Sequence, residues 1–495
     1  MFTKILIANR GEIALRVMRT CKEMGIATVA VYSDADQMAL HTLHADQAVH
    51  IGAAEPAASY LHMEHIIRAA KESGAQAIHP GYGFLAENHM FAERCQEEGL
   101  VFIGPPARVI QALGDKTKAR DIMRHSGVPV IPGMMEAGED PRILAEEARR
   151  LGYPVLIKAA AGGGGKGMRV VQAEAELGAA CRQASAEARA AFGSGDIYLE
   201  KFLKRPRHIE FQILADAHGN AVHLLERECS IQRRHQKIIE ETPSPAMTPE
   251  LRETMGRAAV NAARASGYIN TGTVEFLLDE DGRYYFLEVN TRLQVEHPIT
   301  EMIVGMDLVR QQIRIAAGEP LGFTQQDIFG RGHAIECRIY GEDPENGFMP
   351  SPGRIRFLQE PAGPGIRNDC GVYSGFEVPV EYDPILSKLV VWAEDRNLAI
   401  SRMRSALSQY IILGIKTPIA FLMDVLDSKP FRQGRTFTDF IPAHFADWRQ
   451  SNSEQDLAAV TYIIDAMESP RRRKTVGERS VEPTSPWREL GNWRL

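Results

Sequence analysis

The chain has 495 residues, which is too long for one hydrophobic core, and ordinary domain sizes predict about three domains. Its hydrophobic fraction of 44% and charged fraction of 24% are typical of a globular protein. A formal net charge of −7 argues against broad nucleic-acid binding, which needs a basic surface. No apolar stretch approaches the length of a membrane span, and a strand-like segment rather than a leader opens the sequence. We therefore expect no nucleic-acid or membrane partner and a cytoplasmic location.

The cysteines are widely spaced, and no Cys-x-x-Cys pair occurs among them. This spacing favours neither a zinc site nor a disulfide framework. We expect reduced and mostly buried thiols at six positions: Cys21, Cys95, Cys181, Cys229, Cys337 and Cys370.

The first part of the chain alternates strands and helices. KILIA reads as a strand. Ile13, Val17 and Cys21 then recur at helical spacing, and Gly25 ends this helix. ATVAVY follows as the next strand. The runs AQAIHPGYGF and LVFIGP supply two further short strands around a helical segment. This alternation predicts a doubly wound parallel sheet over residues 1–115. ANRGEIA offers a single glycine, so the dinucleotide fingerprint is missing.

The pattern changes after this first part. A small α+β unit is expected at about residues 130–204, followed by antiparallel strands, a helix and a hairpin up to residue 330. Short strands and turns continue to residue 447, and the remainder is polar and contains proline and arginine. We expect a central domain at 116–330, a third domain at 331–447 and a tail or linker at 448–495.

A glycine cluster lies in KAAAGGGGKGMRVV, residues 158–171. A P-loop is excluded because Ala160 replaces its first glycine and Gly167 replaces its hydroxyl residue. The pattern G-x-G-x-x-G matches at Gly162, Gly164 and Gly167, but a strand-like run follows where the dinucleotide motif requires a helix. A flap that folds over nucleotide phosphates fits this context. A plain mobile loop explains the cluster equally well at this stage.

The strongest local signal is a hairpin in TGTVEFLLDEDGRYYFLEVN. If Asp279 pairs with Tyr284 across the turn EDGR, Glu275 lies directly opposite Glu288. Opposed like charges destabilise a hairpin, and Asn290 adds a third oxygen on the same face, so a bound cation is expected. These hard ligands suit Mg²⁺. The alternative, two carboxylates facing solvent, agrees poorly with the apolar flanking runs.

Polar side chains follow the hairpin at alternate positions. Arg292, Gln294 and Glu296 combine a cationic fork, an amide and a base, a set that would hold a small planar oxyanion and remove its proton. A surface ion pair is the plain alternative. Upstream, SIQRRHQKIIEE supplies further donors, among which Lys237 carries more weight than the histidines, because lone histidines are more often structural.

Long motifs dispersed from residue 1 to about 445 closely resemble the biotin carboxylase family of the ATP-grasp superfamily. They are ILIANRGEIALR, IHPGYGFLAEN, YPVLIKAAAGGGGKGM, EKFLKRPRHIEFQ, RECSIQRRHQK, FLEVNTRLQVEHPITE, RGHAIECRIYGEDP and EYDPILSKL. The resemblance implies an N-terminal doubly wound parallel sheet, a central ATP-grasp fold with a glycine-rich lid subdomain, and a C-terminal mixed α+β domain.

The resemblance also implies an ATP site closed by the glycine flap, which we expect to be mobile without ATP and ordered by it. Where many members of the family have arginine in this flap, the chain has Lys166, which keeps the charge but loses the fork. The implied nucleotide-binding residues are Lys116 and Lys158 at the phosphates, Gly162, Gly163, Gly164, Gly165, Lys166, Gly167 and Met168 in the flap, Glu200, Lys201 and Leu203 at the adenine end, and His208, Gln232 and His235 at the ribose and phosphates.

The remaining implied roles concern metal, bicarbonate and biotin. Two Mg²⁺ or Mn²⁺ ions are held by Glu275, Glu288 and Asn290. Bicarbonate is bound by Lys237, Arg292, Gln294 and Val295, with Glu296 as the base and Arg338 at the ureido oxygen of biotin. The implied reaction phosphorylates bicarbonate to carboxyphosphate and then carboxylates biotin on N1.

The implied partners are a biotin carrier, a carboxyltransferase and a second copy of the chain in a homodimer. The sequence has no AMKM biotinylation motif, so biotin is expected on a separate carrier protein or domain. The acceptor stays open among acetyl-CoA, as in the acetyl-CoA carboxylase of fatty acid biosynthesis, propionyl-CoA, another acyl-CoA and pyruvate. Two other functions are considered, another ATP-grasp ligase and a nucleotide-binding scaffold without catalysis. Arg338 together with Glu296 argues against the first, and the complete set of metal ligands argues against the second.

Overall fold

The computed structural model describes residues 1–134, 136–160, 168–234 and 236–450. Residues Met1–Trp448 form one unit of the chain. It begins with a parallel sheet in the order β3-β2-β1-β4-β5, as predicted for a doubly wound unit. Its strands are β1 (Lys4–Ile7), β2 (Ala27–Ser33), β3 (Gln47–Gly52), β4 (Ala77–His79) and β5 (Val101–Phe102), and its helices are α1 (Gly11–Glu23), α2 (Leu40–His44), α3 (Met63–Ser73) and α4 (His89–Glu97).

Two helices lead from this sheet to a smaller one. They are α5 (Ala107–Gly114) and α6 (Lys116–His125), and the Asp115 side chain caps α6 by accepting from the backbone of Thr117 and Lys118. The small antiparallel sheet has the order β7-β6-β8. Its elements are α7 (Pro141–Leu151), β6 (Val155–Ala159), β7 (Arg169–Val171), α8 (Glu174–Phe192) and β8 (Ile197–Lys201). The predicted flap, Gly162–Gly167, falls between β6 and β7 and outside the described residues.

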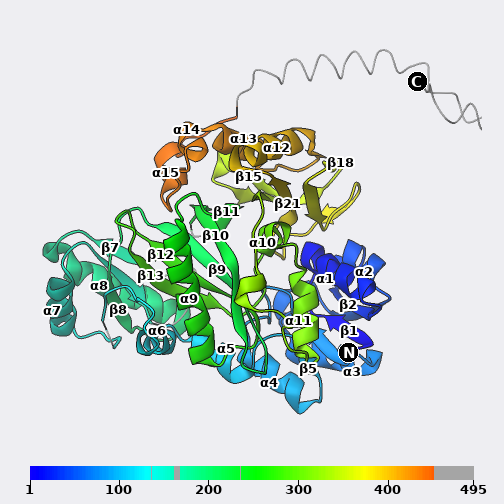
Figure 1. Ribbon diagram of the computed structural model, residues 1–495, viewed down its shortest axis with the longest axis horizontal. Coiled ribbons are helices and arrows are strands. Elements are labelled where there is room, and N and C mark those ends of the chain that lie inside the picture. Colours follow the sequence, from blue (N-terminus) through cyan, green and yellow to red (C-terminus); the bar gives the residue numbers. More distant parts are fainter. Residues whose placement is uncertain (135, 161–167, 235, 451–495) are drawn as a thin grey trace, which may run out of the picture. The chain divides into compact units, whose positions relative to one another are not determined.

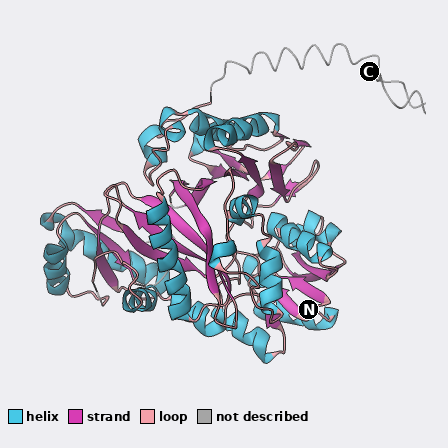
Figure 2. Ribbon diagram, viewed as in Figure 1, coloured by secondary structure: helices cyan, strands magenta, loops and turns pink. Residues whose placement is uncertain are grey.

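The largest sheet has eight antiparallel strands in the order β13-β12-β9-β10-β11-β14-β21-β19, drawn as the long magenta arrows of Figure 2. The sheet continues past residue 330, because β14 and the strands beyond it pair onto β11. The strands are β9 (Arg207–Ala215), β10 (Ala221–Arg233), β11 (Gln236–Thr242), β12 (Asn270–Leu278), β13 (Tyr284–Asn290), β14 (His333–Tyr340), β19 (Ile366–Cys370) and β21 (Ile385–Ala393).

Helices cover this sheet and keep its apolar side chains from water. In Figure 1, α9 (Pro249–Ser266) runs along β9 and β10, where Met255 packs with the buried rings of Phe211 and Phe276. Helix α10 (His297–Val304) packs against β10, β11 and β14, and α11 (Leu308–Ala316) packs against β12. Burying these side chains is the main stabilising term of the fold. It also places α10, which follows directly after the hairpin, over the middle of the sheet.

The C-terminal part adds helices and short strands around β14, β19 and β21. The helices are α12 (Arg396–Gln409), α13 (Ile419–Asp427), α14 (Lys429–Arg432) and α15 (Phe440–His444). The short strands are β15 (Glu342–Asp343), β16 (Met349–Pro350), β17 (Gly353–Arg354), β18 (Phe357–Gln359), β20 (Glu377–Val378) and β22 (Ile411–Leu413). The mixed α+β character predicted for this region is confirmed.

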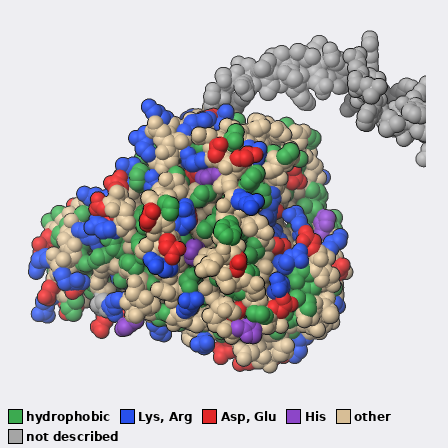
Figure 3. All heavy atoms as spheres, viewed as in Figure 1, with side chains coloured by type: hydrophobic (Ala, Val, Ile, Leu, Met, Phe, Trp, Pro, Cys, Tyr) green, Lys and Arg blue, Asp and Glu red, His purple; other side chains and the backbone are tan. Residues whose placement is uncertain are grey.

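The six cysteines are free thiols, five of them buried and Cys370 half-buried, which agrees with the prediction. Among the described residues, no helix is long and apolar enough to cross a membrane. On the face of the molecule shown in Figure 3, the acidic and basic side chains of these residues are interspersed.

The β12–β13 hairpin pairs Glu275 with Glu288, as predicted, but not for the predicted reason. At the turn, Leu278 and not Asp279 pairs with Tyr284, so the predicted turn register is wrong by one residue. The register shifts between Phe276 and Glu275, as in a β-bulge, and this shift restores the predicted pairing of the carboxylates. The sequence reveals alternation within a strand but does not reveal a bulge.

Candidate active site

Four charged side chains form a row across four neighbouring strands of the large sheet. Glu288 on β13 pairs with Glu275 on β12, Glu275 pairs with Glu210 on β9, and Glu210 pairs with Arg227 on β10. Directly paired residues place their side chains on the same face of a sheet. Glu210 and Arg227 are fully buried and Glu275 is 3% exposed, so the alternative of solvent-facing carboxylates is wrong for Glu275.

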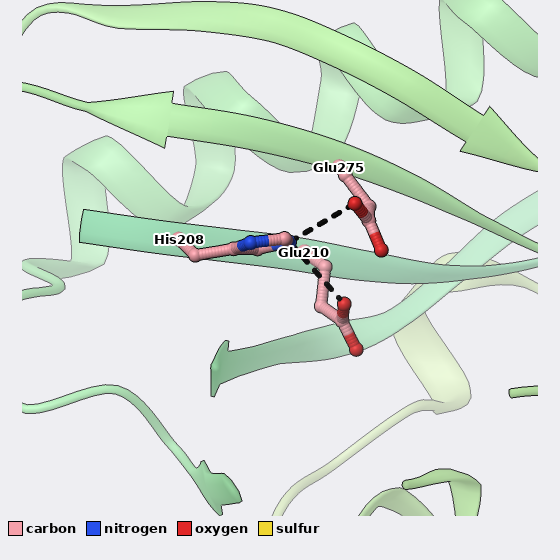
Figure 4. A group of neighbouring side chains, drawn as sticks. All are labelled: His208, Glu210 and Glu275. Carbon is pink, nitrogen blue, oxygen red and sulfur yellow. Dashed lines mark ion pairs between the residues drawn. The ribbon is translucent and has the colours of Figure 1, made fainter. Parts of the chain in front are cut away.

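Lys237 on β11 lies among the carboxylates of this row. Its Nζ donates to Glu210, to Glu275 Oε1 at 2.8 Å and to Glu296 Oε1 at 2.6 Å. His208, on the same strand as Glu210, also points into the cluster, and its Nε2 lies 3.1 Å from Glu275 Oε2 (Figure 4). The anion site predicted around Lys237 is therefore filled by the protein's own carboxylates.

The two paired carboxyl groups of the hairpin have pKa values that move in opposite directions. Burial alone would raise the pKa of Glu275, but the cations Lys237 and His208 outweigh it and hold that pKa well below its ordinary value. Burial and the charge of Glu275 both raise the pKa of Glu288. The surroundings of Glu288 therefore compensate its negative charge poorly, as expected of a carboxylate that binds a metal cation.

Glu275, Glu288 and Asn290 fit a magnesium ion. Asn290 lies on the face of Glu288 two residues further along β13, and its Nδ2 donates to Glu275 Oε1 at 2.8 Å. The three side chains thus gather two carboxylates and an amide, the hard oxygen ligands that Mg²⁺ prefers. His208, Glu210 and Glu275 also lie close enough to share an ion, but Lys237 already binds both carboxylates of that group as a cation.

The segment between β13 and α10 carries the predicted alternating residues. Arg292 Nε donates to Glu87 Oε2 at 3.0 Å, and its Nη2 donates to Asn290 Oδ1 at 3.3 Å. Gln294 is buried and donates from Nε2 to Glu275 Oε1 at 2.8 Å, whereas Val295 is half-buried. The ion pair of Arg292 with Glu87 agrees with the alternative of a surface ion pair that the sequence left open. Gln294, in contrast, points into the protein and donates to Glu275, one of the predicted metal ligands.

Glu296, at the N-terminus of α10, is bound by two cations. Lys237 donates to one of its oxygens, and Arg338 Nη2 donates to the other at 2.9 Å. Burial would raise the pKa of Glu296, but Lys237 and Arg338 outweigh it and lower that pKa far below its ordinary value. Arg338 Nε also donates to Glu240 Oε1 at 2.6 Å, so this guanidinium bridges two carboxylates.

A cavity of about 240 Å³ borders Glu288 and Asn290. Lys158 lies on its wall, and its Nζ pairs with Glu200 Oε2 at 2.5 Å. The charged side chains that line the cavity are Glu87, Lys116, Arg120, Lys158, Glu200 and Glu288, and its apolar lining comes mainly from α5 and β13. The cationic side chains and the predicted metal ligands suit the phosphates of a nucleoside polyphosphate, and the apolar walls suit its base.

The other predicted nucleotide-binding residues lie around this region or outside the described residues. Gln232 is paired with Lys237 across β10 and β11, while the Lys201 ammonium donates to the carbonyl oxygen of Gly152 at 2.7 Å. Leu203 and Met168 are half-buried beside β8 and β7. His235 and the flap residues Gly162, Gly163, Gly164, Gly165, Lys166 and Gly167 fall outside the described residues.

Four residues of the cluster escaped the sequence analysis: Glu87, Glu210, Arg227 and Glu240. One signal was available for Glu210, because His208, Glu210 and Gln212 alternate in an otherwise apolar strand and therefore share a face. For Arg227 and Glu240 the sequence offers only a charge within a strand, and their partners come from segments far away in the chain.

Family models match nearly all of the described chain. Residues 1–110 match the N-terminal domain of biotin carboxylase, and residues 336–443 match its C-terminal domain. Between them, residues 115–324 match the ATP-binding domain of the carbamoyl-phosphate synthase L chain. Together with the cavity and the carboxylate row, these matches define an ATP-grasp protein.

Relatives specify the family. The chain is 57% identical to a pyruvate carboxylase subunit of Methanothermobacter thermautotrophicus, with 89% of this chain and 90% of the relative covered. It is 53% identical to the biotin carboxylase of Nostoc, with 89% and 98% covered. The protein belongs to the biotin carboxylase family.

Solved structures agree with this assignment. The biotin carboxylase domain dimer of the Hydrogenobacter thermophilus 2-oxoglutarate carboxylase, in complex with MgADP, ADP and bicarbonate, has a TM-score of 0.87 at 49% identity, with 91% of this chain and 99% of that chain covered. The biotin carboxylase of Campylobacter jejuni also has a TM-score of 0.87, at 46% identity, with 90% and 99% covered.

Proposed function

We propose that the protein catalyses ATP-dependent carboxylation of biotin with bicarbonate, the first half-reaction of a biotin-dependent carboxylase. The observation that carries the proposal is the convergence of Lys237 and Arg338 on Glu296, beside the paired carboxylates Glu275 and Glu288. This arrangement joins an anion site and a base to a phosphate-binding metal site. The related 2-oxoglutarate carboxylase domain, solved with MgADP and bicarbonate, supports the same ligands here.

ATP is proposed to occupy the cavity bordered by Lys116, Lys158 and Glu288, with its phosphates toward the two lysines. Two magnesium ions at Glu275, Glu288 and Asn290 would neutralise charge on the phosphates and on the γ-phosphoryl group during transfer. The chain's own residues do the positioning. Lys116 lines the same cavity as Glu288, and its charge opposes the rise in the pKa of Glu288.

Bicarbonate is proposed to bind Lys237, Arg292, Gln294 and the backbone at Val295. To do so it must take over part of the Lys237 ammonium, which three carboxylates hold in the structure. Its arrival therefore weakens the contact between Lys237 and Glu296. Since that cation depresses the pKa of Glu296, the carboxylate becomes a stronger base when its substrate is bound. Glu296 then accepts the proton from bicarbonate, and an oxygen of the deprotonated bicarbonate attacks the γ-phosphate of ATP, which gives carboxyphosphate and releases ADP.

Arg338 is proposed to hold the ureido oxygen of biotin as negative charge develops there. Arg338 is 7% exposed, and its guanidinium donates to two carboxylates, Glu240 and Glu296, which fix its plane. A fixed donor stabilises an anion that forms late in the reaction without reorganising at that moment. Carboxyphosphate would break down to carbon dioxide and phosphate. The phosphate would take the proton from N1 of biotin, and the deprotonated N1 would then attack the carbon dioxide.

We further propose that the chain acts as a homodimer with a separate biotin carrier and a carboxyltransferase, and that its domains divide at residues 115, 330 and 447. The relatives are named for different acceptors: one belongs to a pyruvate carboxylase, and another is a domain of a 2-oxoglutarate carboxylase. Acetyl-CoA, propionyl-CoA, another acyl-CoA and pyruvate remain the proposed acceptors for this chain.

The test is ADP release by the purified chain with MgATP. The rate should depend on bicarbonate, and free biotin should stimulate it. ADP release that needs an amine or thiol acceptor instead of bicarbonate would identify another ATP-grasp ligase. Nucleotide binding without any ADP release would identify a scaffold.

A further inference from the structure

Arg227 is the largest fully buried side chain of the described residues, and the reaction proposed above does not use it. It lies on β10 at the end of the carboxylate row, directly opposite Glu210. A buried guanidinium is costly unless its donors are paired. All five of its N–H groups have acceptors: Glu210 Oε1 at 2.5 Å, Gln212 Oε1 at 2.8 Å, Thr300 Oγ1 at 2.9 Å, Thr273 Oγ1 at 3.1 Å and Gln294 Oε1 at 2.7 Å.

The contact with Gln294 sets the direction of its amide. Because Arg227 donates to Gln294 Oε1, the amide nitrogen must face the other way, where it donates to Glu275 Oε1 at 2.8 Å. An amide nitrogen has two donors, so one remains for an anion beside Glu275. Without Arg227, the carbonyl oxygen of Gln294 would lose its cationic donor, and the amide would be free to turn its oxygen toward the site.

The contact with Glu210 controls Lys237. The two oxygens of Glu210 are divided between Arg227 and the Lys237 ammonium, and Glu210 has no exposed surface. If Arg227 were absent, Lys237 would have to compensate most of the charge of this fully buried carboxylate. It would be held more tightly by Glu210 and would give up less of its charge to bicarbonate and to Glu296.

We propose that Arg227 is a positioning residue for bicarbonate recognition, acting through Gln294 and Glu210 without touching a substrate. The inference rests on the proposed function. It predicts a selective effect, since Arg227 donates to Gln294 and shares Glu210 with Lys237, both proposed to bind bicarbonate, but does not line the cavity proposed for ATP.

The experiment measures the KM values for bicarbonate and MgATP in ADP release, together with the Tm, for R227K, Q294A and the double variant. Lysine keeps the charge but not the five-donor fork. R227K should raise the bicarbonate KM about tenfold or more and change the MgATP KM less than about threefold. The double variant should exceed Q294A by less than about threefold, because Arg227 acts partly through Gln294. Equal increases of both KM values, or additive effects in the double variant, would overturn the proposal.

R396K is the matched control. Arg396 also binds a buried carboxylate, in this case Glu241 through two hydrogen bonds, but lies away from the row. It should lower the Tm without changing the bicarbonate KM. A rise in that KM as large as for R227K would show a general effect of packing and would contradict the inference.

If R227K does not fold, the variant T300V tests the proposed role of Arg227 instead. It removes one acceptor of Arg227 while nearly preserving the shape of a buried side chain on α10. The bicarbonate KM should rise about two- to fivefold with an unchanged MgATP KM. An unchanged bicarbonate KM in folded T300V refutes the proposal. If the unmodified chain shows no bicarbonate-dependent ADP release, the proposed function fails first, whereas an active chain with unselective variants refutes only the role of Arg227.

Discussion

Glu275 and Glu288 face each other across the β12–β13 hairpin, although the strand register shifts by one residue between this pair and the turn. Two like charges in direct opposition are unfavourable, and the raised pKa of Glu288 reflects burial together with its neighbour's charge. The pairing therefore favours the binding of a cation and does not stabilise the fold by itself.

Replacing Glu288 with glutamine should abolish turnover mainly through loss of metal. We expect the activity to fall at least about a hundredfold, with a smaller change in nucleotide affinity. The Tm without metal should not fall, because a repulsion is removed. Titration of activity with Mg²⁺ measures the effect, and E280Q in the turn of the same hairpin is the control. An unchanged magnesium dependence in E288Q would contradict a metal site at this pair.

Substitutions of Glu296 and of Arg338 should affect ATP cleavage and biotin carboxylation differently. E296A removes the proposed base before phosphoryl transfer, so bicarbonate-dependent ATP cleavage and biotin carboxylation should fall together. R338Q keeps the base and the metal ligands but removes a charged contact to an anion that forms later. Carboxylation should then fall further than ATP cleavage.

The measurement compares both activities at saturating substrates, with nucleotide binding as the control for folding. Some loss of ATP cleavage is expected in R338Q, because Arg338 contacts Glu296 directly. Equal and near-complete loss of both activities in folded R338Q would place Arg338 in the first half of the reaction.

Replacing Lys237 with methionine should destabilise the protein, because three buried carboxylates lose their shared cation. Breaking a buried ion pair from one side costs about 3 kcal/mol or more. Mg²⁺ should restore part of the Tm, and more than it adds to the unmodified protein, since we propose that it binds the same Glu275. K158M, which deprives Glu200 of one of its two cationic partners, is the comparison. An equal effect of Mg²⁺ on both variants would argue against metal at Glu275.

Glu240 should make stability depend on pH near neutrality. Burial is the main cause that raises its pKa from 4.5 to about 7, and the charge of Glu296 adds to it. The folded state then binds the proton more tightly than the unfolded state, so this contribution is complete below about pH 4.5 and is lost as the pH rises through about 7. The loss corresponds to about 3 kcal/mol for such a difference in pKa.

The variant E240Q cannot titrate, so its stability relative to the unmodified protein should rise between pH 5 and pH 8, a range of about three units. The free energy of unfolding, or the Tm where unfolding is irreversible, measures this at several pH values. E280Q on the surface should show no such trend. Parallel pH profiles for E240Q and the unmodified protein would show that Glu240 does not ionise in this range.

The sequence determined the parts of this protein that depend on local pattern. Alternating strands and helices predicted the parallel sheet of residues 1–115. The hairpin itself was also predicted, and Glu275 does oppose Glu288 in it, although the predicted turn register was wrong by one residue. Long motifs pointed to the biotin carboxylase family, which the comparisons confirm. Such features are visible because strand and helix periods link residues a few positions apart.

Only the tertiary structure decided which charges meet. Lys237 lies among carboxylates from β9, β12 and the start of α10, and Arg227 bonds to side chains 15 to 73 positions away. The bulge that corrects the hairpin register is likewise invisible in the sequence. Long-range electrostatic partners depend on which strands pair, and the sheet order β12-β9-β10-β11-β14 follows from burying side chains against α9 and α10, not from any local pattern.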